Sequence, residues 1–292
     1  MKRIFLSLFF CFVLWPSCLL AADWKVLHER ADRTGLIEAK LSARNNPASE
    51  DDLYILGLVY FNMHRDNDAR DAFNEILRSN PGSIKAKWGE AEFLRRSHEL
   101  GEAERALLEI IKTAPEFWPA YISLAYVRFI KTDFDGSVRL SEQVLRQGRG
   151  KVDLSNYVRA HLLLAGSKGV IAHFGGLVSK LINGVSVYPN LEKAENLKPE
   201  SAEVKFGMGA FYLLAPPIDG GNINEAEKYL QDAIKLDKYF ADPYVRLAQV
   251  YGVKGDKAKY EEYLNKALEI DPLNELALDV KSGRCRFICV GR

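Results

Sequence analysis

Five histidines are the side chains best suited to bind a metal or to move a proton: His28, His64, His98, His161 and His173. None has a second histidine or a cysteine at the short spacing of a metal site. His161 and His173 flank an unusual stretch and could approach each other in space. A lone histidine on a helix is more often packed or solvated, so the sequence predicts no metal site and no catalytic histidine.

Glycine-rich motifs give no stronger sign of chemistry. No serine stands in a Gly-x-Ser-x-Gly turn. Residues 148–151, Gly-Arg-Gly-Lys, lack the earlier glycine and the hydroxyl residue of a phosphate-binding loop. Residues 219–222, Asp-Gly-Gly-Asn, lack the alternating oxygen ligands of a calcium loop and are typical of a flexible turn. We therefore expect a protein that is not an enzyme and has no cofactor.

The N-terminus has the order of a secretory signal peptide. Lys2 and Arg3 precede an apolar run over residues 4–14, and the small residues Ala21 and Ala22 follow. The run is broken at Pro16 and is shorter than the roughly 20 residues that cross a bilayer. We expect cleavage after Ala22, a periplasmic protein and no integral membrane span in the mature chain.

Four cysteines divide between the two ends of the chain. Cys11 and Cys18 belong to the predicted leader, and a lipid anchor on Cys18 is less expected because Trp-Pro-Ser precedes it and does not match a lipobox. Cys285 and Cys289 could pair in an oxidising compartment. A four-residue spacing on a continuous helix has poor disulfide geometry, so a bond there would require an irregular tail. The sequence leaves both states open.

The net charge limits the kinds of partner. It is +1 for the whole chain, and loss of the two positive charges of Lys2 and Arg3 leaves about −1. Without a strong positive field, the chain has no electrostatic means of gathering nucleic acid. We therefore expect no nucleic-acid partner.

A period of 34 residues organises the chain and must position any binding site. The prolines of the period are Pro47, Pro81 and Pro115. Its small residues form two series: Gly35, Ala69, Ala103 and Ser137, and Gly57, Ala91 and Ala125. Small residues allow two helices to approach closely, and a proline ends a helix because it donates no backbone hydrogen bond. The pattern predicts stacked pairs of antiparallel helices.

The residues of one unit carry a family resemblance: Leu53, Leu56, Gly57, Tyr60, Ala69, Phe73 and Pro81. In that register the chain resembles the tetratricopeptide repeat (TPR) proteins. Further units resemble the repeat at Ala91, Ala103 and Pro115, at Tyr121, Ala125 and Ser137, at Gly209, Tyr212 and Ala226, and at Tyr244, Ala248 and Pro272. The resemblance implies an all-α, right-handed helical-repeat solenoid of helix-turn-helix units.

The segment over residues 152–201 is about 16 residues too long for a single unit. Two long helices are expected there, with interruptions or close backbone approach at residues 165–169 and 174–176. The predicted division is a signal peptide (1–22), N-terminal units (23–151), an elongated divergent unit (152–201), C-terminal units (202–274), and a capping helix and tail (275–292). This arrangement resembles, loosely, the periplasmic TPR component of tripartite (TRAP) transporters and the regulator-of-microtubule-dynamics proteins.

In a TPR solenoid the first helix of each unit lines a concave groove. The helix phase places ten side chains there: Tyr54, Leu58, Phe61, Lys85, Trp88, Arg95, Arg96, Ile122, Tyr126 and Phe129. Aromatic residues and arginine often anchor interfaces. We therefore expect the groove to bind a peptide or another envelope protein, although such a stripe can also fill the core between units.

A second function class stays open on the sequence alone. The apolar residues Leu162, Leu163, Leu164, Val170 and Ile171 could enclose a cavity for a small apolar ligand. The chain would then be an accessory component of a solute transporter. The leading expectation is an exported, non-enzymatic TPR scaffold.

Overall fold

The computed structural model describes residues 17–46 and 49–291, and within these ranges the secondary structure is helical with no strand. The predicted leader therefore lies mostly outside the described residues, as does Pro47 of the proline series. The helices are α1 (Ser17–Ala31), α2 (Leu36–Asn45), α3 (Glu50–Asn62), α4 (Asp66–Ser79), α5 (Ile84–Arg96), α6 (Leu100–Thr113), α7 (Trp118–Ile130), α8 (Phe134–Lys151), α9 (Leu154–Phe174), α10 (Leu177–Asn183), η1 (Gly184–Ser186), α11 (Val187–Leu197), α12 (Ala202–Leu214), η2 (Pro217–Asp219), α13 (Ile223–Leu236), α14 (Ala241–Val253), α15 (Lys257–Ile270) and α16 (Glu275–Ser282).

Side-chain caps define where many helices begin. The hydroxyl of Ser49 accepts a hydrogen bond from the backbone N–H of Asp52, and the hydroxyl of Ser83 accepts one from Ala86. Asn274 caps α16 in the same way through the N–H of Ala277. Each cap satisfies a backbone donor that the helix itself leaves without a partner. The polar residues between apolar segments thus set the helix boundaries.

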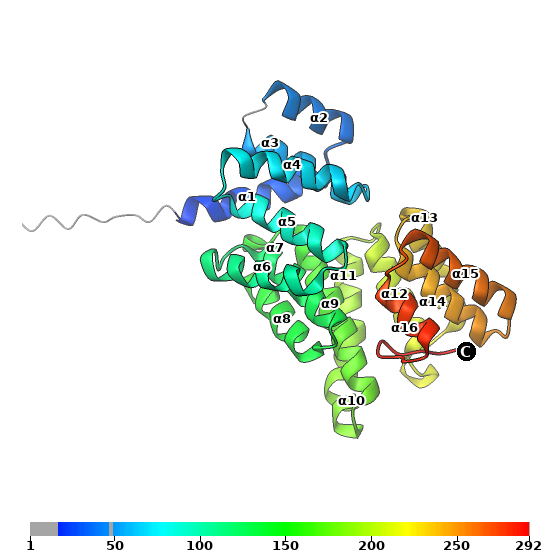
Figure 1. The fold of residues 1–292 in the computed structure, drawn as a ribbon. Helices are drawn as coiled ribbons and strands as arrows, with labels where there is room; N and C mark the ends of the chain where they lie inside the picture. The colour runs from blue at the N-terminus through cyan, green and yellow to red at the C-terminus, as the bar shows by residue number, and fades with distance from the viewer. Residues whose placement is uncertain (1–16, 47–48, 292) are drawn as a thin grey trace, which may run out of the picture.

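The helices pair as α3–α4, α5–α6, α7–α8, α12–α13 and α14–α15, and the pairs stack into a solenoid (Figure 1). The ring of Phe73 determines the spacing of the first pairs. A Cβ atom at Gly57 would lie 2.5 Å from this ring, and one at Gly89 would lie 2.3 Å from it. Gly57 belongs to α3 and Gly89 to α5, so one buried ring fills the space between two successive units. The predicted solenoid of TPR-type units is confirmed.

The N-terminal helix departs from the regular stacking. Helix α1 packs on α3 and reaches α9. Its Trp24 contacts Phe117, just before α7, and its His28 contacts Trp88 of α5. The helix therefore crosses several units on their inner side. Its first residues, 17–22, belong to the predicted leader.

The elongated unit agrees only in part with the two interrupted helices expected. Residues 165–169 lie inside the continuous helix α9, so the predicted interruption there is wrong. Gly175 and Gly176 do end that helix and separate it from α10, as predicted. The returning segment is broken into α10, η1 and α11. Figure 1 shows α10 protruding beyond the stacked pairs.

Two histidine bridges join the N-terminal and C-terminal halves. His64 Nε2 lies 2.7 Å from Asp237 Oδ2, and His98 Nε2 lies 3.0 Å from Asp271 Oδ1, with 173 residues separating the partners in both pairs. His98 Nδ1 also lies 2.9 Å from Glu275 Oε1. Both histidines have positive φ at the turn within their helix pair. We call these contacts the histidine clasps.

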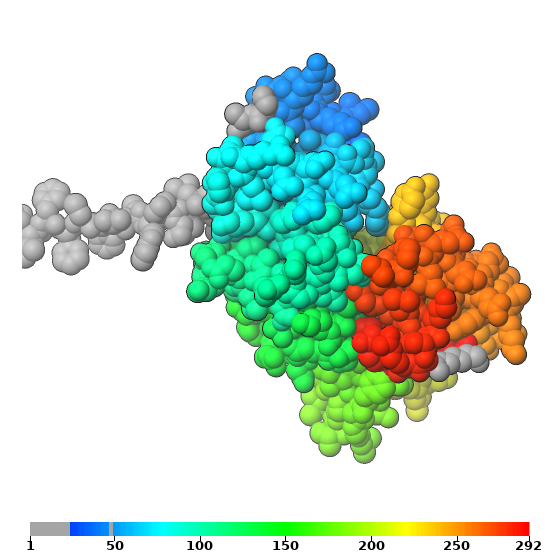
Figure 2. Space-filling view, in the orientation of Figure 1, coloured from blue at the N-terminus to red at the C-terminus, as the bar shows by residue number. Residues whose placement is uncertain are grey.

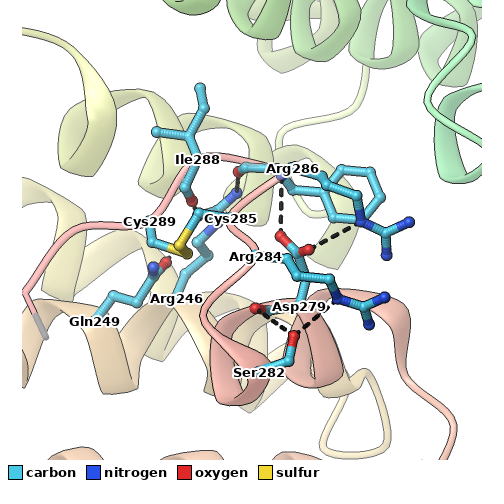
Figure 3. The surroundings of a disulfide bond; sticks show 10 residues. Arg246, Gln249, Asp279, Ser282, Arg284, Cys285, Arg286, Ile288 and Cys289 are labelled. Carbon is cyan, nitrogen blue, oxygen red and sulfur yellow. Dashed lines mark hydrogen bonds and ion pairs between the residues drawn. A yellow bond between two sulfur atoms is a disulfide. The ribbon is translucent and has the colours of Figure 1, made fainter.

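The C-terminal tail, whose disulfide and its surroundings are drawn in Figure 3, forms a third contact between the halves. Gly283 ends α16 in the left-handed conformation, and an irregular tail follows in which Cys285 and Cys289 form a disulfide. Asp279 accepts hydrogen bonds from the Phe287 N–H and from Arg286 Nε. The ring of Phe287 stacks on Phe129 of α7 at 5.5 Å. The disulfide thus closes a loop whose aromatic residue packs against the N-terminal half.

Overpacking at a helix contact tests the repeat register. Ala69 and Ala103 are fully buried. Replacing either with leucine should lower the free energy of unfolding by about 1–3 kcal/mol, because the added side chain has no space. Arg105→Leu, on the exposed side of the same helix as Ala103, is the control. Equal urea-unfolding midpoints for Ala103→Leu, the control and the wild type would contradict the register.

The His98 clasp predicts a dependence of stability on pH. Hydrogen bonds to Asp271 and Glu275 raise the pKa of His98 to about 10. A histidine pKa that is higher in the folded state contributes stability fully below about pH 6.5, and this is lost as pH rises through about 10. His98→Asn tolerates the positive φ but cannot carry the charge. In urea unfolding, the free energy of unfolding of His98→Asn should be lower than that of the wild type by roughly 1–2 kcal/mol at pH 6.5. This difference should shrink toward zero at about pH 10.5.

Candidate peptide-binding groove

A single large groove runs along the inner side of the solenoid. Its volume is about 2010 Å³, and α3, α5, α7, α9, α12, α14, α16 and the C-terminal tail all contribute to its walls. Figure 2 shows the C-terminal units packed directly against the central helices, so both halves of the chain build one body. The histidine clasps lie at its margin, since His64 and His98 line it together with Asp237 and Asp271.

Eight of the ten residues predicted for the groove line it: Leu58, Phe61, Trp88, Arg95, Arg96, Ile122, Tyr126 and Phe129. The other two do not. Tyr54 is fully buried between His28 and the ring of Phe73. Lys85 Nζ donates a hydrogen bond to Oδ1 of Asp51, on the neighbouring helix α3, at 2.5 Å. For these two residues the predicted placement is wrong, because contacts between adjacent units occupy both side chains.

Trp88 belongs to the core more than to an open surface. Its side chain is 5% exposed, and its Nε1 donates a hydrogen bond to Ser123 Oγ at 3.1 Å. The rings of His28, Tyr54 and Phe117 surround it. Helix α1, which no repeat position predicted, covers this part of the inner surface. Here the aromatic stripe fills space within the fold, which is the alternative that the sequence left open.

A partly buried ion pair holds Arg95 on the groove wall. Its Nη2 lies 2.6 Å from Glu92 Oε1, and its guanidinium lies over the ring of Tyr126. Burial alone would raise the pKa of Glu92, but Arg95, Arg96 and the hydroxyl of Ser123 outweigh it and lower this pKa. The guanidinium of Arg95 is therefore committed to a carboxylate within the protein.

Arg96 and Phe129 are likewise held by contacts within the protein. Arg96 donates to Asp66 Oδ1 and to the backbone carbonyl of Phe61. Phe129 packs between Phe134 and Phe287. These residues shape the groove through fixed positions, and a bound segment would meet them as preformed walls.

Sequence reasoning missed the ion pairs of the groove wall. Arg159 of α9 donates to Glu203 of α12 at 3.1 Å, and Lys198 lies 3.5 Å from Asp32, which follows α1. Burial opposes the ionisation of Glu203, but Arg159 and the Ser201 hydroxyl lower its pKa to about 2. Arg159 and Lys198 belong to the divergent unit, and Asp32 precedes the first matched repeat, so the period assigned none of the three a helix phase.

Metal-binding geometry is not seen in residues 17–46 and 49–291, where no group of three potential ligands is close enough to hold an ion. His161 Nδ1 donates to Asn190 Oδ1 at 2.8 Å, and His173 contacts Phe174. The described residues show no contact between the two histidines. In the same ranges, every helix is too short or too polar to span a bilayer.

Comparison with known proteins agrees with the repeat architecture of the helix pairs. A family model described as tetratricopeptide repeat matches residues 53–83, which include the α3–α4 pair. The chain contains a tetratricopeptide repeat (TPR) and has the helical-repeat fold of TPR proteins. This TPR protein also matches, over residues 187–281, the model of the TRAP transporter T-component. The match extends from α11 through α16, so the predicted resemblance to the transporter component is supported in the C-terminal third. The looser resemblance to the regulator-of-microtubule-dynamics proteins stays a prediction.

Solved structures share the fold at low sequence identity. A TPR protein from Parabacteroides merdae ATCC 43184 has a TM-score of 0.52 at 14% identity, over 89% of this chain and 98% of that one. A chain of the APC/C hetero-tetramer Cut9–Hcn1 has a TM-score of 0.62 at 15% identity, over 90% of this chain. The TPR protein spans 48% of that longer chain. No curated protein matches it significantly in sequence.

The partly buried ion pair predicts a specific pattern of stability. Arg95→Met should lower the free energy of unfolding by about 1–3 kcal/mol, because it removes the cation that lies nearest to the Glu92 carboxylate. The double variant with Glu92→Gln should recover part of that loss. Arg105→Met, at an exposed ion pair, should change stability by less than about 1 kcal/mol. Urea unfolding of the four proteins measures the coupling, and additive losses would contradict it.

Proposed function

We propose that this TPR protein is a non-enzymatic scaffold whose groove binds a segment of another envelope protein. The groove volume carries the proposal. At about 2010 Å³ it exceeds the roughly 300–1,000 Å³ of most small-molecule pockets. A helix or an extended segment of a partner has the size to fill it, and TPR repeats are protein-binding modules.

The walls define the chemistry of the bound segment. Phe206 and Phe211 on α12 supply aromatic surface, and Leu162 on α9 supplies aliphatic surface. Oppositely charged side chains that line the groove are paired, as Arg159 is with Glu203, so the groove has no strong field of one sign. We therefore propose a partner segment with apolar anchors, whose polar groups hydrogen-bond to the paired side chains. Apolar anchors supply most of the affinity in such interfaces.

The predicted leader and the family match support the compartment that we propose, which is the periplasm. The signal-peptide order of residues 1–22 favours export. The match of residues 187–281 to the TRAP transporter T-component favours a periplasmic protein that works beside a transporter. We propose that the partner is another envelope protein and that the contact involves no nucleic acid.

One feature of the groove favours a second candidate. On α9 and α12 the wall is built from small residues, which are Gly166, Gly169, Gly207 and Ala210. Leu162, Val170 and Phe211 line the same part of the groove, where an apolar small molecule would be desolvated. In this alternative the TPR protein carries a solute for a transporter.

Filling the groove tests its role directly. A Cβ at Gly166 would meet only Phe129, at an ordinary contact distance of 3.6 Å, so a larger side chain there extends without a backbone clash. Gly166→Trp should reduce partner capture at least tenfold, a loss of about 1.4 kcal/mol in binding. Gly101→Trp is the matched control, because Gly101 lies on α6, outside the groove walls, and nothing approaches its Cβ position.

Crosslinking mass spectrometry in envelope extracts would measure capture, with circular dichroism as the folding check. Retention of every partner by a folded Gly166→Trp variant would overturn the groove as the binding site. Native mass spectrometry separates the two candidates. A co-purifying lipid or solute that Gly166→Trp excludes, without any crosslinked protein, would favour the solute carrier.

A further inference from the structure

The protruding end of the divergent unit carries an unusual concentration of exposed apolar side chains. Helix α10 and its neighbours extend beyond the stacked pairs (Figure 1). Six large apolar side chains there are each at least 60% exposed: Phe174, Leu177, Val178, Leu181, Ile182 and Val185. We call these six residues the apolar tip. Contiguous exposed apolar surface of this kind marks an interaction site.

The spacing of these residues explains why the fold does not bury them. Leu177, Val178, Leu181, Ile182 and Val185 recur at the intervals that form one broad face of a helix. No residue of α10 itself is buried. Gly175 and Gly176 separate the helix from α9 and turn it away from the stacked pairs. The sequence therefore builds an apolar face and the backbone projects it outward.

The apolar tip carries one positive charge and no negative one. Between residues 169 and 191 the sequence contains Lys180 but no aspartate or glutamate. The nearest preceding cations in the sequence, Lys168 and Arg159, pair with Glu142 and Glu203. Lys180 lies on α10 among the apolar residues and is exposed. The chain as a whole has nearly equal numbers of acidic and basic residues, so the lack of carboxylates here is a local property.

We propose that the apolar tip inserts into the surface of an anionic lipid bilayer. Elements of this kind place an apolar face at the boundary between headgroups and acyl chains while basic residues contact anionic lipid. A protruding finger needs no complementary pocket in a fluid bilayer, whereas a protein partner would have to supply one. Insertion of the tip would hold the TPR protein at the membrane without a spanning segment. Leu177, Leu181 and Val185 also line the groove, but membrane insertion of the tip does not require the function proposed for the groove.

Vesicle flotation tests the insertion. The wild-type protein should float with vesicles of phosphatidylethanolamine and phosphatidylglycerol at 7:3. Leu177→Glu with Leu181→Glu should lower the bound fraction at least tenfold. The matched control is Ile37→Glu with Leu41→Glu, which changes another exposed apolar pair with the same four-residue spacing, on α2. All variants share one N-terminus, so a difference between them reports the tip.

A local probe makes the result independent of the leader. Lys180→Cys, labelled with a polarity-sensitive dye in a Cys11→Ser, Cys18→Ser background, should shift to shorter wavelength when these vesicles are added. The same dye at Ile37→Cys should not shift. The absence of a shift at position 180 would overturn the proposal. Sedimentation velocity adds a second test. Self-association that the tip variant abolishes, in a protein that does not bind vesicles, would overturn it in favour of a contact between copies.

Discussion

The close approach of successive helix pairs is the constraint on which the rest of the structure depends. The ring of Phe73 fills a space that Gly57 and Gly89 leave open, and a Cβ at either glycine would overlap it. Gly209 repeats the arrangement against Leu230 in the C-terminal units. Each contact sets how far one unit rotates relative to the next. The course of the solenoid, and with it the shape of the groove, follows from these local distances.

Contacts between the N-terminal and C-terminal halves then fix the walls of the groove. The histidine clasps and the contact of Phe287 with Phe129 connect units far apart in the sequence. Arg246, buried beneath the tail, donates to the carbonyls of Phe287 and Ile288 and fixes the tail on α14. The groove is therefore preorganised by contacts at its margin, which lowers the entropy that a bound segment must overcome.

The repeat period was enough to predict the fold class and the part of the groove wall on α3, α5 and α7, because both depend on residues at a constant spacing. It placed Leu58, Arg95 and Tyr126 on the inner surface. It misplaced Tyr54 and Lys85 because their partners lie on neighbouring helices. The covering of Trp88 by α1 could not be predicted, since α1 has no repeat register. Spacing alone also could not decide the pairing of Cys285 with Cys289, which depends on where α16 ends.

The equal separation of the two histidine clasps has a consequence for how this chain can change length. An open solenoid tolerates the gain or loss of a whole unit, because each unit contacts only its neighbours. Here His64 and His98 meet Asp237 and Asp271 across the same interval of 173 residues. Loss of one unit between His98 and Asp237 would leave every remaining helix pair intact and yet separate the partners of both bridges. The histidine clasps thus require a fixed number of units between their partners. A unit cannot be gained or lost there without the loss of these contacts.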